Sequence, residues 1–151
     1  FAVVSTLFFL LPIWMFLRMA LNAIDGMLAR EFNQKTPLGG YLNEATDVIS
    51  DTALYLPFAF VAPFGWGIIA LIIFLSFMSE FLGVLGQVHG SSRRYDGPMG
   101  KSDRALLMGI YGLLAYFGVG IQAYSQVVFA IVIALLLLST FTRLKKGLYA
   151  A

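Results

Sequence analysis

The chain has 151 residues, of which 60% are hydrophobic and only 12% are charged, and its mean hydropathy is +0.84. A soluble domain is typically about 25% charged, so this composition excludes an ordinary water-soluble fold and indicates a membrane domain. Cysteine is absent, which excludes a disulfide framework and a thiolate metal site. The net charge of +2 favours no class of partner, and we expect no nucleic-acid partner.

Apolar runs along the chain approach or exceed the roughly 20 residues that span a bilayer core. With their polar shoulders they predict five helices, near residues 1–33, 39–62, 66–89, 103–122 and 125–145. We therefore expect an all-α, polytopic transmembrane helix bundle that forms a single domain over residues 1–151, with five spans. The start lacks a basic segment and a cleavage-like site, so it is not a signal peptide. Because residue 1 is not methionine, we expect it to lie within a longer natural chain.

The basic residues are distributed unevenly along the predicted hairpins. Nine of the ten fall in the first loop, the third loop or the C-terminal segment, whereas the turns near residues 62–67 and 120–125 carry no charge. By the positive-inside rule, this asymmetry places the basic side in the cytoplasm and the start of the chain outside.

The first predicted helix becomes polar toward its end. Residues three or four apart share one face of a helix, and this spacing gathers a polar stripe with Gly26 beside it: Arg18, Asn22, Asp25 and Ala29. Ionisable side chains inside a membrane span are costly, so they indicate a functional site.

The second predicted helix carries a matching stripe. Asn43, Asp47 and Asp51 lie at positions i, i+4 and i+8, and Glu44 shares their face. The loop between the two helices is short, so the helices should be antiparallel neighbours. We therefore expect the two stripes to face each other near the cytoplasmic end.

These side chains suit a hard divalent cation. Several carboxylates cannot share a low-dielectric pocket unless a cation neutralises them, and oxygen ligands select Mg²⁺, Mn²⁺ or Ca²⁺ over soft metals. The candidate metal ligands are Asn22, Asp25, Asn43, Glu44, Asp47 and Asp51. Gly26 and Ala29 leave space for a ligand, and Arg30 offers a planar fork to phosphate oxygens. Polar contacts that merely join helices, worth about 0.6 kcal/mol each, suit single amides and hydroxyls but not facing carboxylates.

The loop before the fourth predicted helix is the other polar concentration. It carries four cations on the same predicted side as the acids: Arg93, Arg94, Lys101 and Arg104. Two interpretations stay open, recognition of an anionic acceptor such as a polyol phosphate and contact with anionic lipid headgroups. The acceptor role is favoured for Lys101 and Arg104. Two deeper charges, Arg18 and Glu80, need partners, and each other or Asp25 are the candidates.

The polar residues of the first two helices resemble the signature of the CDP-alcohol phosphotransferase (CDP-alcohol phosphatidyltransferase) family, D-x₂-D-G-x₂-A-R-x₈-G-x₃-D-x₃-D. The chain reads Asn22-x₂-Asp25-Gly26-x₂-Ala29-Arg30, eight residues, and then Gly39-x₃-Asn43-x₃-Asp47. Every spacing agrees, and six of the eight motif positions are identical. The motif covers 26 residues, and the helical layout extends the resemblance over the whole chain.

The resemblance implies a six-helix enzyme of phospholipid biosynthesis, commonly a homodimer, in the bacterial cytoplasmic membrane with its active site facing the cytoplasm. With Mg²⁺ or Mn²⁺, it would transfer a phosphatidyl or other phosphoalcohol group from a CDP-alcohol, with CDP-diacylglycerol favoured, to the hydroxyl of a small alcohol, and release CMP. The acceptor would be phosphorylated or not, and membrane lipid would surround the protein. The family's first span would precede residue 1.

The same resemblance implies roles for the motif residues. Asp25 would bind metal, and Asp47 would be the base that deprotonates the acceptor. The residues that would surround the cytidine diphosphate are Gly26, Ala29, Arg30 and Gly39.

The chain departs from the motif at two positions, where Asn22 and Asn43 replace acids. Asp51, one turn beyond Asp47, and Glu44 are candidates to offset the lost charges, and Asp51 joins Asp47 as a candidate catalytic residue. A second register, which ends on Asp47 and Asp51, is disfavoured because it lengthens the spacer. Two rival functions stay open: a catalytically silent relative that binds nucleotide or metal, and a cation transporter with an acidic intramembrane site.

Overall fold

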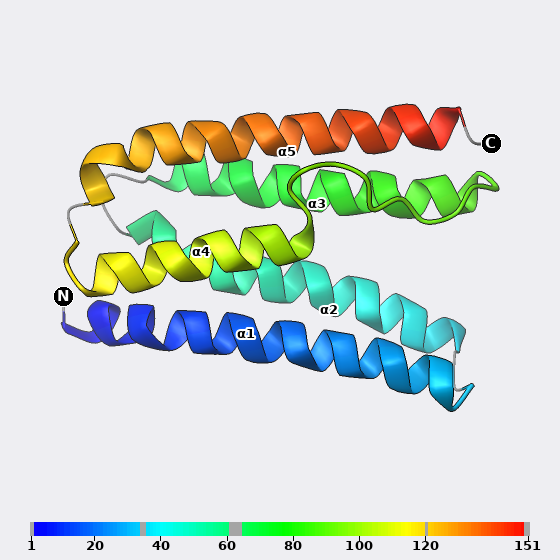
Figure 1. Ribbon diagram of the computed structural model, residues 1–151, viewed down its shortest axis with the longest axis horizontal. Helices are drawn as coiled ribbons and strands as arrows, with labels where there is room; N and C mark the ends of the chain where they lie inside the picture. Colours follow the sequence, from blue (N-terminus) through cyan, green and yellow to red (C-terminus); the bar gives the residue numbers. More distant parts are fainter. Residues whose placement is uncertain (1, 34–35, 61–64, 120, 150–151) are drawn as a thin grey trace. The chain divides into compact units, whose positions relative to one another are not determined.

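A computed structural model describes residues 2–33, 36–60, 65–119 and 121–149, and within these ranges it leaves out the side chains of residues 2–7, 29, 30, 121 and 122. Five α-helices and two short 3₁₀ helices make up its regular structure (Figure 1). They are α1 (Ala2–Glu31), α2 (Pro37–Tyr55), η1 (Leu56–Phe60), α3 (Trp66–Val88), α4 (Lys101–Tyr116), η2 (Ile121–Tyr124) and α5 (Ser125–Leu148). The described residues form no strand, so the predicted all-α class is confirmed.

Two helices are shorter than the sequence predicts, for identifiable reasons. Helix α2 gives way to 3₁₀ turns after Tyr55, where Pro57 has no N–H to donate to the preceding turn. Helix α4 ends at Tyr116 because Gly118 adopts a positive φ of 65°. There the Val119 N–H donates to the Leu114 carbonyl at 3.1 Å, as in a Schellman motif.

Three helices of the described chain are long and apolar enough to cross a membrane: Phe8–Leu28 within α1, Trp66–Val88 and Ser125–Leu148. Helix α4 has 16 residues, which extend about 24 Å at 1.5 Å per residue, somewhat less than a bilayer core. The chain is therefore a multi-pass integral membrane protein.

The structure divides into two compact units. The first unit comprises Phe1–Leu54 and Ala105–Ile121, and the second comprises Tyr55–Arg104 and Gln122–Ala151. Helix α4 is shared between them, since its first turn belongs to the second unit and the remainder to the first.

The first unit is organised by one buried stripe on α1. Phe8, Leu11, Met15 and then Arg18 are buried and lie three or four residues apart, so they share a helix face. Helix α4 approaches this stripe at Gly109, where an added Cβ would lie 3.7 Å from the Met15 sulfur. The apolar stripe is thus followed, on the same face of α1, by the first residue of the polar stripe.

In the second unit, α3 and α5 lie side by side and run in the same direction (Figure 1). Their facing stripes combine apolar and small residues, which allow transmembrane helices to approach closely. The buried positions of α3 are Ile69, Ile72, Leu75, Ser76, Ser79, Glu80, Gly83 and Gly86, and those of α5 are Ser125, Phe129, Val132, Leu136, Ser139 and Arg143. One acid and one base therefore lie in an otherwise uncharged interface.

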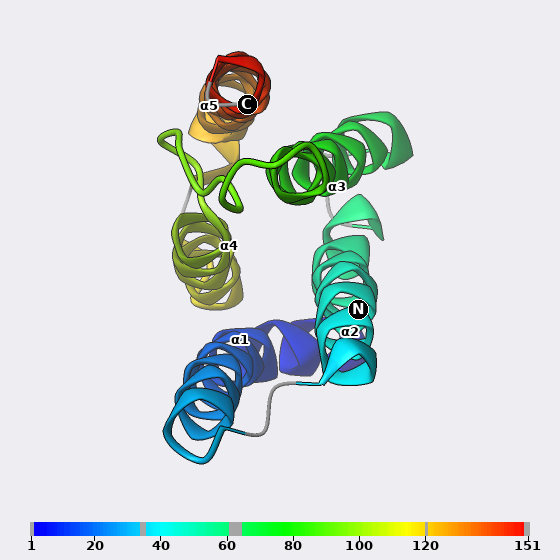
Figure 2. The same ribbon diagram turned by 90° about the vertical axis from the view of Figure 1, so that its right-hand side faces the viewer.

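The loop over residues 89–100 folds back along α3 and α5 before it enters α4 (Figures 1 and 2). The Arg94 N–H donates to the Gly83 carbonyl at 3.0 Å, and the Met99 N–H donates to the Ser139 hydroxyl at 3.1 Å. Gly97 has a φ of +112°, and an added Cβ there would lie 2.5 Å from the Ser139 hydroxyl oxygen. The loop can lie this close to α5 because Gly97 has no side chain.

We predict that Gly97→Ala destabilises the fold, since it adds both backbone strain and a steric clash. The expected loss is about 1–3 kcal/mol in the free energy of unfolding, measured by thermal unfolding of the protein in detergent. Gly67→Ala is the matched control, because an added Cβ in α3 there meets nothing within 4 Å. The control should unfold at or slightly above the wild-type temperature. Equal melting temperatures for the two variants would contradict the close approach at Gly97.

Candidate functional site

Arg18 joins the polar stripes of α1 and α2. Its Nη2 lies 2.7 Å from Asp51 Oδ1 and 3.4 Å from Asp47 Oδ1. The same nitrogen donates to the Asp47 carbonyl at 3.1 Å, and Nε donates to the Ser50 hydroxyl. Arg18, Asp47 and Asp51 are 9%, 5% and 7% exposed. The stripes that the helical spacing predicted to face each other are thus joined by a buried ion pair.

Asn22 also contacts Asp47, and it does so as a donor. Its side-chain Nδ2 lies 2.8 Å from Asp47 Oδ1. An aspartate at position 22 would place a second negative charge against this oxygen, whereas the amide stabilises it with a hydrogen bond. The departure from the family motif is therefore a favourable contact.

The other predicted metal ligands differ in their burial. Asp25 is exposed, whereas Asn43 and Glu44 are half-buried on α2. Among the described residues, no group of three or more His, Cys, Asp or Glu side chains is arranged to hold a metal ion. Asp47 and Asp51 nevertheless offer carboxylate oxygens, the donors that a hard cation prefers, while Asn22 faces Asp47 through its amide nitrogen. In the structure, the Arg18 guanidinium supplies the positive charge beside both acids.

The predicted nucleotide-binding residues lie on either side of the loop that joins α1 to α2, at one end of this hairpin. Gly26 is half-buried on α1, and Gly39 is exposed in the first turn of α2, where its N–H donates to the Thr36 hydroxyl at 3.0 Å. The side chains of Ala29 and Arg30 lie outside the described part of the structure.

A second charged cluster is centred on Glu80 of α3. Its carboxylate oxygens lie 3.1 Å from Arg104, 3.3 Å from Arg143 and 3.6 Å from Arg93. Arg104 and Arg143 are each 1% exposed. Burial lowers the pKa of Arg93, which also lies over the Tyr95 ring. Three guanidinium groups therefore lie around the Glu80 carboxylate.

This cluster accounts for two of the predicted acceptor-binding residues, Arg93 and Arg104. A third, Arg94, donates to the Lys146 carbonyl on α5 at 3.1 Å. Lys101, the fourth, is half-buried in the first turn of α4. Sequence reasoning placed Arg143 in the basic C-terminal segment and expected that segment to contact lipid headgroups, whereas Arg143 is buried and pairs with Glu80. Its position on the apolar stripe of α5, four residues after Ser139, indicates this burial.

Arg18 and Glu80 have different partners from those that the sequence suggested. Each was expected to pair with the other or with Asp25. Instead, Arg18 pairs with Asp47 and Asp51, and Glu80 pairs with arginines of the loop, α4 and α5. Hydropathy and spacing place a charge on a helix face but do not select its partner among several acids.

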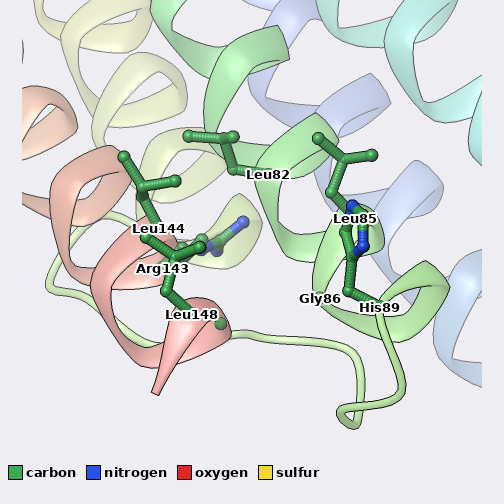
Figure 3. Close-up of a pocket in the computed structure, with 8 residues that line it drawn as sticks. Leu82, Leu85, Gly86, His89, Arg143, Leu144 and Leu148 are labelled. Carbon is green, nitrogen blue, oxygen red and sulfur yellow. The ribbon is translucent and has the colours of Figure 1, made fainter. Parts of the chain in front are cut away.

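A small pocket of about 250 Å³ lies where α3 and α5 end together. Figure 3 shows Arg143 extending from α5 toward α3, where its Nη1 donates to the Ser79 carbonyl at 2.8 Å. The other lining residues are mostly apolar: Leu82, Leu85, Gly86, His89, Leu144, Gly147 and Leu148. An apolar pocket at a helix end suits a hydrocarbon chain better than a polar substrate.

Comparison with known proteins defines the class of the molecule. The family model described as CDP-alcohol phosphatidyltransferase matches residues 1–142. The chain therefore belongs to the CDP-alcohol phosphatidyltransferase family, as its motif predicted.

A curated relative supports this assignment. The Escherichia coli (strain K12) protein called "Inner membrane protein YnbA" is 47% identical over 142 residues, which cover 94% of this chain and 71% of the relative. No solved structure matches the chain significantly. The family supports a membrane transferase that acts on a CDP-alcohol and an alcohol acceptor, and its members generally use a divalent metal.

We predict that Glu80→Gln strongly destabilises the protein, because it removes the negative charge that lies within 3.6 Å of three buried or half-buried guanidinium groups. The expected loss is about 3–5 kcal/mol in the free energy of unfolding, measured by thermal unfolding in detergent. Glu31→Gln, the same change at an exposed residue of α1, should leave the melting temperature within about 1 °C of wild type. A small effect at position 80 would mean that the cluster is not neutralised by its carboxylate.

We also predict a pH-dependent contribution from the loop. Lys146 Nζ lies 2.6 Å from Asp96 Oδ1, and this hydrogen bond holds the pKa of Asp96 below its ordinary value of 3.8. A lowered carboxyl pKa stabilises the folded state above 3.8 and stops doing so as the pH falls through the folded-state value. Lys146→Met should thus cost about 0.2–1 kcal/mol at pH 7 and almost nothing near pH 2.

The matched control for this comparison is Lys145→Met, on the neighbouring exposed lysine of α5. Its effect on the melting temperature should be small at both pH values. A Lys146 effect that persists at pH 2 would indicate lost packing of the lysine stem and would contradict the ion-pair origin.

Proposed function

We propose that the protein is an integral membrane transferase that moves a phosphatidyl or other phosphoalcohol group from a CDP-alcohol to an acceptor hydroxyl and releases CMP. CDP-diacylglycerol is the first candidate donor, in phospholipid biosynthesis. One observation carries the proposal: family motif residues from α1 and α2 meet at Asp47, which is buried and bonded by Asn22 and Arg18. A carboxylate held by several donors in this way has a fixed orientation toward a substrate.

Asp47 is proposed as the general base that takes the proton from the acceptor hydroxyl. A positioned base contributes about 10²–10⁴-fold to the rate of such a step. The residues proposed to hold Mg²⁺ or Mn²⁺ are Asp25 and Asp47, with Asn22, Asn43, Glu44 and Asp51 as further oxygen ligands. When bound, the cation would neutralise the pyrophosphate oxygens and the leaving CMP.

The nucleotide is proposed to lie over the α1–α2 hairpin. Gly26, Ala29 and Gly39 have small or absent side chains, so the diphosphate can approach the backbone, and Arg30 can pair with phosphate oxygens. Glycine at position 39 also avoids a contact, since a Cβ there would lie 3.0 Å from the Thr36 hydroxyl.

The Glu80 cluster is the proposed acceptor-binding region. Its excess of guanidinium groups favours an acceptor that carries a negative charge, such as a phosphorylated alcohol, because an anion would neutralise buried arginines. Arg94 of the loop and Lys101 in the first turn of α4 are proposed to belong to the same acceptor-binding region. We further propose a homodimer in a bacterial inner membrane, with the basic side facing the cytoplasm.

A catalytically silent relative is the second candidate. Arg18 offsets part of the negative charge of Asp47 and Asp51, and Asn22 adds a hydrogen bond where the motif has a further carboxylate, which suits a protein that binds nucleotide without turnover. The cation transporter suggested by intramembrane acids is disfavoured by membership of the transferase family.

The test is CMP release by the purified protein with CDP-diacylglycerol and Mg²⁺ or Mn²⁺, over a panel of free and phosphorylated alcohols. We predict that CMP appears with one acceptor class and that Asp47→Asn lowers its rate by about 10²–10⁴-fold. Glu31→Gln, an acid-to-amide change at an exposed residue, should keep the wild-type rate. Nucleotide binding without CMP release from any acceptor would favour the silent relative.

A further inference from the structure

Arg18 makes several hydrogen bonds and ion pairs with α2. Its guanidinium reaches two carboxylates, a hydroxyl and a backbone carbonyl, all on one turn of α2. The shorter ion pair is with Asp51, at 2.7 Å against 3.4 Å for Asp47. Asp51 is the acid that lies beyond the family motif. Arg18 and Asp51 therefore form a pair that the motif does not include.

The position of Arg18 is fixed by its helix. It continues the buried stripe of Phe8, Leu11 and Met15, so its stem is held by packing while its head group points at α2. Asp47 and Asp51 are four residues apart, and two like charges at that spacing repel each other in a low dielectric. One guanidinium between them relieves this repulsion.

A metal ion at Asp47 would lie close to the same guanidinium. The two cations would share the Asp47 carboxylate, and their repulsion is poorly screened at a buried site. The side chain that stabilises the metal-free acids must therefore oppose metal binding.

We propose that Arg18 is a resident counter-ion of the acidic site, which retains Asp51 as its own partner and competes with the divalent metal for Asp47. Arg18 acts as a positioning residue, because it contacts the proposed base and ligand rather than the reacting atoms. Asp51 is then the anchor of Arg18, and this role replaces the metal-ligand role proposed for Asp51 above. The inference rests on the proposed function only in placing the metal at Asp47.

The test is a Mn²⁺ titration of the full chain in detergent, without nucleotide, in which the spectroscopic signal of free Mn²⁺ gives the dissociation constant. Arg18→Gln removes the competing cation and should tighten binding about tenfold or more. Arg18→Lys keeps the charge and should stay within about threefold of wild type. Asp51→Asn removes one of the two carboxylates that pair with Arg18, so Arg18 should pair more strongly with Asp47 and weaken Mn²⁺ binding about tenfold. Lys145→Gln, an exposed change on α5, should alter nothing.

Unchanged or weaker Mn²⁺ binding in Arg18→Gln overturns the proposal, and so does the absence of Mn²⁺ binding in every variant. If Arg18→Gln does not fold, the double variant that combines Arg18→Gln with Asp51→Asn tests the proposal instead, because it removes one positive and one negative charge together. It must bind Mn²⁺ more tightly than Asp51→Asn alone, and equal or weaker binding overturns the proposal. Wild-type CMP release, measured in parallel, separates the two hypotheses, since it tests the transferase and does not depend on the Arg18 series.

Discussion

A charge that leaves water must be neutralised by a partner, and this constraint shapes both polar clusters of the protein. In the first unit, Arg18 meets two aspartates, whereas in the second unit Glu80 meets three arginines. Each cluster lies where an apolar helix stripe ends. Packing of the apolar stripes therefore brings the charged side chains together. The ion pairs that result then hold the neighbouring elements against each other.

The two clusters, one in each unit, combine their charges in opposite proportions. Acids exceed bases around Arg18, so the first cluster can accept a cation. Bases exceed acids around Glu80, so the second can accept an anion. Neither imbalance is large, because each cluster already contains a charge of the opposite sign. A ligand of either cluster would thus compete with a side chain rather than fill an uncompensated site.

Much of this architecture is readable from the sequence, because hydropathy locates membrane helices and a 3.6-residue period locates their faces. The five helices and the facing stripes at Asn22 and Asp47 follow in this way. The helix ends were predicted less accurately. The end of α4, for example, depends on the positive φ of Gly118, which the hydropathy pattern does not indicate. The partners of Arg18 and Glu80 were not predicted, because several acids and bases satisfy the same pattern and only tertiary distances select among them.

The hydrogen bond from Asn22 to Asp47 has a consequence for biogenesis. With acids at both positions, a cation or a bound proton would have to offset the repulsion between them in the bilayer. The amide removes that requirement, so the α1–α2 hairpin can assemble as soon as both helices have been inserted. Assembly of the hairpin is thereby separated from the supply of divalent ions.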